Sequence, residues 1–155
     1  AHADRQRAYA AHGNRRTIYT PEMVVQGQTD IVGTKPMKLA EAIATHAGMA
    51  PKIDLTLARN GDSLRISAAA LAALPSDMVV HLLRYTPRHT TKIKRGENRG
   101  KTQEYANIIE GWSQVGSWDG RAPLELSASL EGDKPIVVSI QDGAAGPILA
   151  AARLR

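Results

Sequence analysis

The sequence has no cysteine and no phenylalanine, and aromatic residues make up only 4% of its 155 residues. Without cysteine, the chain itself excludes disulfides, thiol catalysis and thiolate metal sites. With so few aromatic rings, a folded core must be built from Leu, Ile, Val, Ala and Met. No apolar run approaches the roughly 20 residues needed to cross a bilayer, and no signal-peptide segment precedes the first residues, so we predict no membrane span.

The charge balance is basic, with a formal net charge of +5 and a pI near 9.7. Basic surfaces attract anionic partners such as nucleic acid or anionic lipid. Stacking aromatic residues are scarce, however, and single-stranded nucleic-acid sites depend on them. We therefore expect no nucleic-acid partner.

The first 50 residues predict a helix, a hairpin and a second helix. Residues 3–12 are rich in good helix formers and end at Gly13-Asn14. Residues 18–25 and 28–33 are strand candidates on either side of Gly27, which indicates a hairpin. The second helix begins near Lys35-Pro36 and shows apolar residues at helical spacing on one face.

After Pro51 the pattern becomes that of short strands separated by Gly, Asp and Pro. Alternating polar and apolar residues surround Asn60-Gly61, a strong hairpin signal. The residues 68–74 fit either a helical turn or a strand continuation. The predicted strands cover residues 52–57, 63–67, 78–85, 91–94, 105–114, 124–129, 135–141 and 148–153. Strands of this length and spacing predict an antiparallel β-sandwich over residues 51–155, beside a smaller α/β segment over residues 1–50.

Pro21 stands at the start of a strand candidate, directly after Thr20. A proline at the first residue of an edge strand explains this position without any function. A cis-proline that supports a redox site explains it equally well, although X-Pro bonds are cis in only about 5–6% of cases. The residues alone leave both interpretations open.

Six stretches follow one another in an order that resembles a known family. They are Arg5–Tyr9 (RQRAY), Tyr19–Gly27 (YTPEMVVQG), Arg95–Thr102 (RGENRGKT), Tyr105–Ile109 (YANII), Gly116–Gly120 (GSWDG) and Gly146–Ala152 (GPILAAA). On these stretches the chain resembles the DUF1223 family of bacterial, usually exported, thioredoxin-like proteins of unknown function. The resemblance covers nearly all of the chain.

The resemblance implies an α+β fold: the C-terminal half of a thioredoxin-like fold, followed by an antiparallel β-sandwich. It also places Thr20 and Pro21 at the cis-proline site. The family's amino-terminal Cys-x-x-Cys segment is missing here, so the redox partners of that site are absent. The resemblance further implies a periplasmic or secreted location. Half a thioredoxin sheet would leave strand edges open, so we expect as partner the missing N-terminal half or a second copy of the chain.

The most unusual polar stretch contains Arg95, Glu97, Asn98, Arg99 and Lys101, separated by two glycines. Its basic residues and a backbone nest at glycine could hold an anion or a partner. A charged, glycine-containing hairpin tip is more often a solvated loop, and that is the favoured interpretation.

Tyr105 and Asn107 share one face if this stretch is a strand, with Trp112 nearby. We favour buried side chains that fix a loop by hydrogen bonds over a binding pocket. The five histidines lack metal-ligand spacing, His81 falls within an apolar strand, and no serine lies in a nucleophile-elbow context. We therefore predict no catalytic residue, no metal site and no cofactor.

Beside anion or nucleic-acid binding through Arg95, Arg99 and Lys101, which would weaken steeply with salt, these observations lead to two functional hypotheses. The first is a non-catalytic binding or structural portion of an exported thioredoxin-like protein. The second is part of a thiol-disulfide oxidoreductase whose dithiol lies in a segment absent from this chain.

Overall fold

The structure is a computed structural model that describes residues 2–13, 22–33 and 35–155. Neither of the helices in these ranges is long and apolar enough to cross a bilayer. In chain order the elements are α1 (His2–His12), β1 (Glu22–Val25), β2 (Thr29–Val32), α2 (Pro36–Ala47), β3 (Ile53–Asn60), β4 (Ser63–Ala70), β5 (Met78–Lys92), β6 (Thr102–Trp118), β7 (Leu124–Ser129), β8 (Ile136–Asp142) and β9 (Ile148–Leu154).

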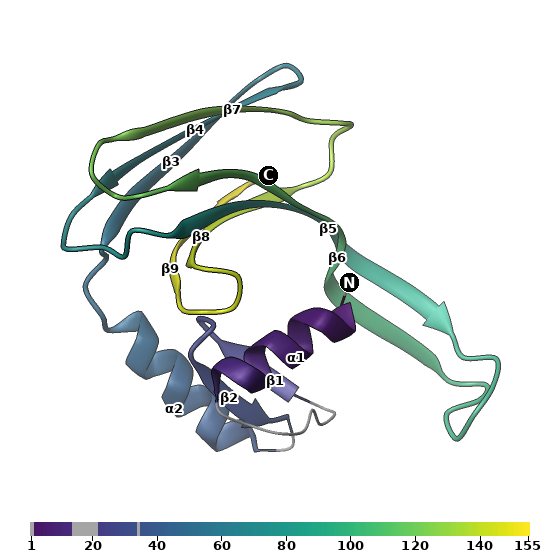
Figure 1. The fold of residues 1–155 in the computed structure, drawn as a ribbon. Helices are drawn as coiled ribbons and strands as arrows, with labels where there is room; N and C mark the ends of the chain where they lie inside the picture. Colours follow the sequence, from purple (N-terminus) through teal and green to yellow (C-terminus); the bar gives the residue numbers. More distant parts are fainter. Residues whose placement is uncertain (1, 14–21, 34) are drawn as a thin grey trace.

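The N-terminal elements are the predicted helix, hairpin and helix, and they form one tier of the molecule (Figure 1). β1 and β2 pair antiparallel, and the turn between them has Gln26 and Gly27 at positive φ, 52° and 67°. The hairpin turn also touches the last hairpin of the chain. A Cβ on Gly27 would lie 2.6 Å from the carbonyl oxygen of Gly146, and Ile148 N donates to Gln26 O at 2.8 Å. Glycine is needed here both for its φ and for this close approach.

Two antiparallel sheets make up the rest of the chain. The three-stranded sheet has the order β3-β4-β7, and the four-stranded sheet has the order β6-β5-β8-β9. The Asn60-Gly61 turn joins β3 to β4, as predicted, with Asn60 opposite Ser63. Of residues 68–74, for which a helical turn and a strand continuation were both open, residues 68–70 continue β4 as a strand, and residues 71–74 form neither helix nor strand.

The core lies between the two sheets. Leu64 and Ile66 of β4, together with Val80, Val138 and Ile140 of the other sheet, have no exposed surface. The remaining buried members are Ile53, Ala68, Met78, Leu82, Trp118, Leu124, Leu130 and Ile136. In the absence of phenylalanine, aliphatic side chains and a single buried tryptophan therefore fill the core. The molecule combines a helix-covered hairpin with two packed antiparallel sheets, an α+β architecture.

β5 and β6 differ from the prediction, because they are not short strands. The expected strands 78–85 and 91–94 are one strand of 15 residues, and 105–114 lies inside a strand of 17 residues. Pro87 and the charged residues after it suggested a break. The strand passes through them because this part of β5 has only one partner, β6, and its other edge is free where a missing N–H costs little.

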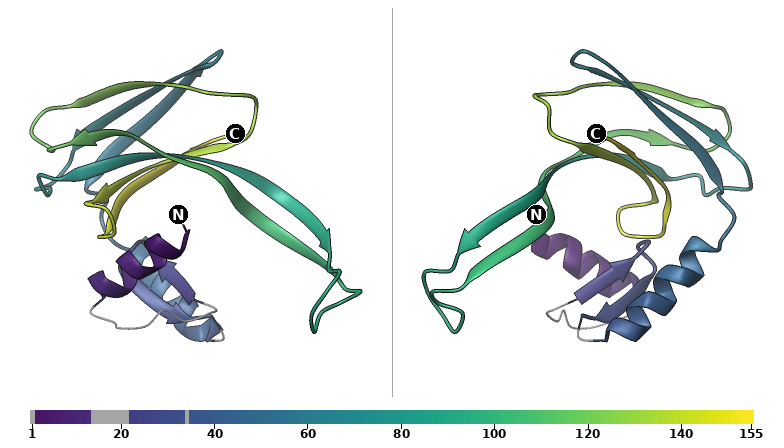
Figure 2. Two further views of the ribbon diagram at one scale, coloured as in Figure 1. Left: turned by 45° about the vertical axis from the view of Figure 1, so that its right-hand side comes forward. Right: turned by 180° about the vertical axis from the view of Figure 1, so that it is seen from behind.

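The two long strands extend beyond the sandwich as a hairpin arm, defined here as residues 86–108 (Figure 2). β8 pairs with β5 only as far as Arg84, so past that residue the arm has no neighbouring strand. At its base Glu110 pairs with Lys134 and accepts a hydrogen bond from Thr86 Oγ1 at 2.6 Å. This contact ties the start of the arm to the loop that enters β8.

Candidate functional site

The predicted loop residues Arg95, Glu97, Asn98, Arg99 and Lys101 all lie exposed at the tip of the arm. The tip is a hydrogen-bonded turn. Gly100 N donates to Ile93 O at 2.8 Å, Arg99 N donates to Gly96 O at 3.0 Å, and Lys101 Nζ donates to Asn98 Oδ1 at 3.0 Å. Asn98 and Lys101 therefore bind each other. The tip as a whole presents positive charge to solvent.

Tyr105 and Asn107 are exposed on the arm, so the expectation that they are buried is wrong. Tyr105 lies opposite His89 and keeps 44% of its surface in solvent. The physical reason is the length of β5 and β6, which carries these residues beyond the edge of the sheet. Asn107 has φ 54° and lines a cavity at the base of the arm together with Ile109. A binding role for Asn107 stays a prediction.

Thr20 and Pro21, the predicted cis-proline site, lie outside the described residues. The structure shows only that a strand, β1, begins at Glu22 directly after them. Their role stays a prediction.

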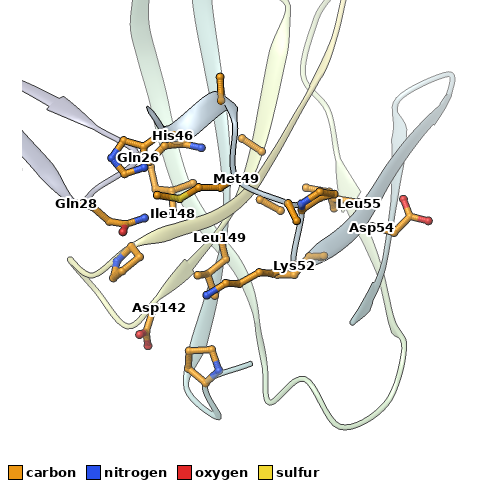
Figure 3. Close-up of a pocket in the computed structure, with 18 residues that line it drawn as sticks. Gln26, Gln28, His46, Met49, Lys52, Asp54, Leu55, Asp142, Ile148 and Leu149 are labelled. Carbon is orange, nitrogen blue, oxygen red and sulfur yellow. The ribbon is translucent and has the colours of Figure 1, made fainter. Parts of the chain in front are cut away.

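A cavity of about 640 Å³ opens between the N-terminal tier and the sheets (Figure 3). α2, the turn after β1, the start of β3 and the start of β9 contribute its walls. Apolar side chains such as Met49, Leu55 and Leu149 alternate with polar ones from Gln26, Gln28, His46 and Lys52. Figure 3 shows Lys52 extended toward Leu149, whereas Asp54 points away from the other labelled polar groups.

His46 is the chemically most versatile group in this cavity. Its Nε2 lies 2.9 Å from Thr29 Oγ1, and its buried Nδ1 has no hydrogen-bond partner. A catalytic histidine needs a group that orients it, usually a carboxylate on the second ring nitrogen. No such group contacts His46 in the described part of the chain, and those residues contain no cluster of three metal-binding side chains. The cavity thus offers amide, imidazole and ammonium groups for binding, without an assembled catalytic set.

A second polar cluster fastens α1 to the outer face of the four-stranded sheet. Arg5 donates to Gln141 Oε1 at 3.0 Å and to Tyr9 Oη at 2.6 Å. Gln141, which has no exposed surface, donates in turn to Tyr9 Oη at 3.1 Å and to Gly146 O at 2.7 Å. The Arg5 guanidinium also stacks 3.8 Å above the ring of Trp112. All of these side chains have partners, which indicates a structural clamp.

His81 lies beside this clamp, edge-on to Trp112 with ring centroids 5.5 Å apart. Its side chain is 8% exposed and its Nδ1 is buried without a partner. Burial, and secondarily the positive charge of Arg5, lower the pKa of His81. His81 is therefore held neutral within a cationic environment. The position of His81 agrees with the prediction of a histidine within an apolar strand. The side chain is buried and does not lie at the surface.

Sequence patterns did not single out the clamp or the cavity residues. One signal was available: Gln141 directly follows Ile136–Ile140, a stretch that is apolar except for Ser139, and a buried amide in such a strand requires partners. His46 gave no comparable signal, because an isolated histidine on a helix is ordinary.

Two comparisons with known proteins bear on the fold and the family. The model of a family described as "Protein of unknown function (DUF1223)" matches residues 1–141. An X-ray structure of a structural-genomics target protein from Agrobacterium tumefaciens is similar to this chain with a TM-score of 0.76 and 19% sequence identity. The match covers 98% of this chain and 68% of that one. At this identity the likeness shows the fold alone. No curated protein matches the chain.

Proposed function

Because the chain belongs to the DUF1223 family, whose function is unknown, we propose that it is a non-catalytic binding and structural portion of an exported thioredoxin-like protein. In this proposal residues 1–50 are the second half of a thioredoxin layer and residues 51–155 are a sandwich domain that positions it. The complete protein would act in the periplasm or outside the cell.

The observation that supports the proposal most strongly is the exposure of the apolar face of α2. The helix is amphipathic, yet none of its side chains is buried. Met37 and Ile43 are 72% and 52% exposed. Helices in globular proteins gain most of their stability by packing their apolar face. An apolar helix face left open in this way supports a further layer element as its neighbour.

The small sheet supports the same proposal. It contains only β1 and β2, and no other strand in the described residues pairs with either of them. Val32 and Met23 are 36% and 39% exposed. A two-stranded sheet is marginally stable in water by itself, and open edges invite pairing. Additional strands supplied by an N-terminal half would complete both the sheet and the cover of α2.

The proposal is tested on the protein purified from its natural source by intact mass and peptide sequencing. We expect a longer polypeptide, or a companion fragment, that contains Cys-x-x-Cys. Hydrogen exchange then compares α2 in that material with α2 in residues 1–155 alone. Slower exchange of the α2 amides by about tenfold or more in the complete material supports the proposal. Equal exchange in the two samples contradicts it.

A second candidate function is thiol-disulfide exchange by the complete protein. The observation that favours it is the position of Thr20-Pro21 immediately before β1, where a thioredoxin-like protein places its cis-proline. Residues 1–155 contain no thiol and must be inactive alone. If the complete protein reduces insulin disulfides, and Pro21→Ala lowers that rate while the fold is kept, this function is supported. A complete protein without dithiol activity would exclude it.

A further inference from the structure

The outer face of the four-stranded sheet carries one row of side chains whose composition is unusual. Strand pairing places Trp112 of β6 opposite Leu83 of β5, Leu83 opposite Val137 of β8, and Val137 opposite Arg153 of β9. The row therefore consists of three apolar residues followed by one arginine, and it runs across the sheet from β6 to β9. Cross-strand neighbours in such a row lie within contact distance.

Next to this row a cavity of about 280 Å³ opens at the base of the arm. It is lined by Leu83, Tyr85, Asn107, Ile109, Val137 and Arg153. Its volume lies near the lower limit of ligand pockets, roughly 300 Å³. Among the described residues no carboxylate belongs to the lining, so the charge that these residues place at the cavity is positive.

Arg153 differs from Arg59 and Arg84, two other arginines of the sheets, in having no partner. Arg59 pairs with Asp133 at 3.2 Å, and Arg84 pairs with Glu131 at 3.3 Å. Within the part of the chain that the structure describes, Arg153 has neither a hydrogen bond nor an ion pair. Its side chain is exposed on the edge strand β9, so the guanidinium at this apolar cavity is accessible to an anionic ligand.

From this geometry we infer that the cavity at the base of the arm binds a small amphipathic carboxylate. The apolar tail lies against Leu83, Ile109 and Val137, and the carboxylate accepts hydrogen bonds from the Arg153 guanidinium. Arginine suits this role because its planar fork matches a carboxylate with two parallel hydrogen bonds. The inference does not depend on a thioredoxin half or on the location of the protein.

The test uses residues 1–155 and three probes: octanoate, octyltrimethylammonium with the same tail and the opposite charge, and acetate with the head group alone. Isothermal titration calorimetry measures affinity, and amide NMR shifts locate the site on β5, β6, β8 and β9. We expect octanoate to bind at least about tenfold more tightly than either other probe, the difference that one charge-assisted hydrogen-bonded pair supplies. Absence of octanoate binding, or equal binding of the octyl cation, overturns the inference.

Arg153→Gln removes the charge while keeping a side chain of similar length, and it should weaken octanoate about tenfold or more. Arg153→Lys should restore part of the affinity. The matched control is Arg65→Gln, which removes an exposed strand arginine from the other sheet and should leave the affinity unchanged. If Arg153→Gln changes only the stability of the protein and not octanoate affinity, the arginine merely packs its aliphatic stem on the sheet, and the inference is wrong.

Discussion

Gln141 is the residue on which the contacts between α1 and the sheet converge. It donates to Tyr9 and Gly146, accepts from Arg5, and is fully buried. Gln141→Leu keeps the volume but leaves buried polar partners unsatisfied, so we expect the free energy of unfolding to fall by about 1–3 kcal/mol. Urea unfolding followed by circular dichroism measures this. Gln114→Leu, at an exposed position of β6, should change it by less than about 0.5 kcal/mol; equal effects at the two positions would refute the clamp.

His81 makes the stability of the fold depend on pH. Its pKa is lowered in the folded state by burial and by Arg5, while the unfolded chain has the ordinary value near 6.5. Below about pH 6.5 the unfolded state binds the proton more readily. The stabilisation from neutral His81 is therefore complete above that pH and is lost as the pH falls through the folded pKa.

Unfolding in urea at about pH 8 and about pH 5.5 tests this titration. We expect the wild type to lose more stability between the two conditions than His81→Gln, which cannot titrate. His12→Gln, an exposed histidine at the end of α1, should retain the wild-type pH dependence. An unchanged pH dependence in His81→Gln would contradict the prediction.

At the scale of elements, β6 packs closely against β7 through a glycine. A Cβ on Gly116 would lie 2.5 Å from Leu126 Cδ1. On Gly111 of the same strand a Cβ would instead meet Nε of the flexible Arg84 side chain at 3.2 Å. We expect Gly116→Ala to destabilise the protein by about 1–3 kcal/mol because it overpacks the contact between the sheets. Thermal unfolding should show a smaller effect for Gly111→Ala, and the reverse order would contradict this account.

The arm is the element that contributes least to the core. Past Arg84 its strands pair only with each other, and a lone hairpin is marginal in water. Replacing residues 88–106 by an Asn-Gly turn should therefore change the free energy of unfolding by less than about 1 kcal/mol. Chemical denaturation measures the change. A loss of several kcal/mol would show that the arm supports the fold rather than extending from it.

Most helices and strands could be predicted from the sequence. The arm shows why some could not. Alternation located β3 and β4, because each has a more buried face that imposes a period of two, and the Gly, Asp and Pro residues between short strands located β7, β8 and β9. The arm is exposed on both faces, so no alternation marked it. Pro87 and the basic residues then resembled a boundary, and only pairing between distant strands shows their continuity.

At the scale of the whole molecule, the open face of α2 gives a prediction that rests on the proposed function. Ile43→Ser should leave the stability of residues 1–155 within about 0.5 kcal/mol, since Ile43 is 52% exposed. In the complete protein, where a further layer would cover the helix, the same substitution should cost about 1–3 kcal/mol. Unfolding both forms measures the difference. Glu41→Ser on the same helix is the control, and a cost for Ile43→Ser that is the same in both forms would argue against the cover.

The candidate sites were less predictable than the fold. The polar stretch from Arg95 to Lys101 was found by composition, and the structure places it at the arm tip in one turn. The cavity with His46 and the row ending at Arg153 join residues that are far apart in the chain. Their individual neighbourhoods in sequence are unremarkable, so no local pattern could assign them.

Most of the elements, the hairpin turns, the aliphatic composition of the core and the exclusion of thiol chemistry within the chain could be predicted from the sequence. These follow from local periodicity, turn residues and residue chemistry. Only the tertiary structure decided that β5 and β6 form an arm, that Gln141 fastens α1, and that Arg153 faces an apolar cavity without a counter-charge. The physical reason is that burial, pairing register and the availability of a partner arise between strands distant in sequence, where composition and periodicity carry no information.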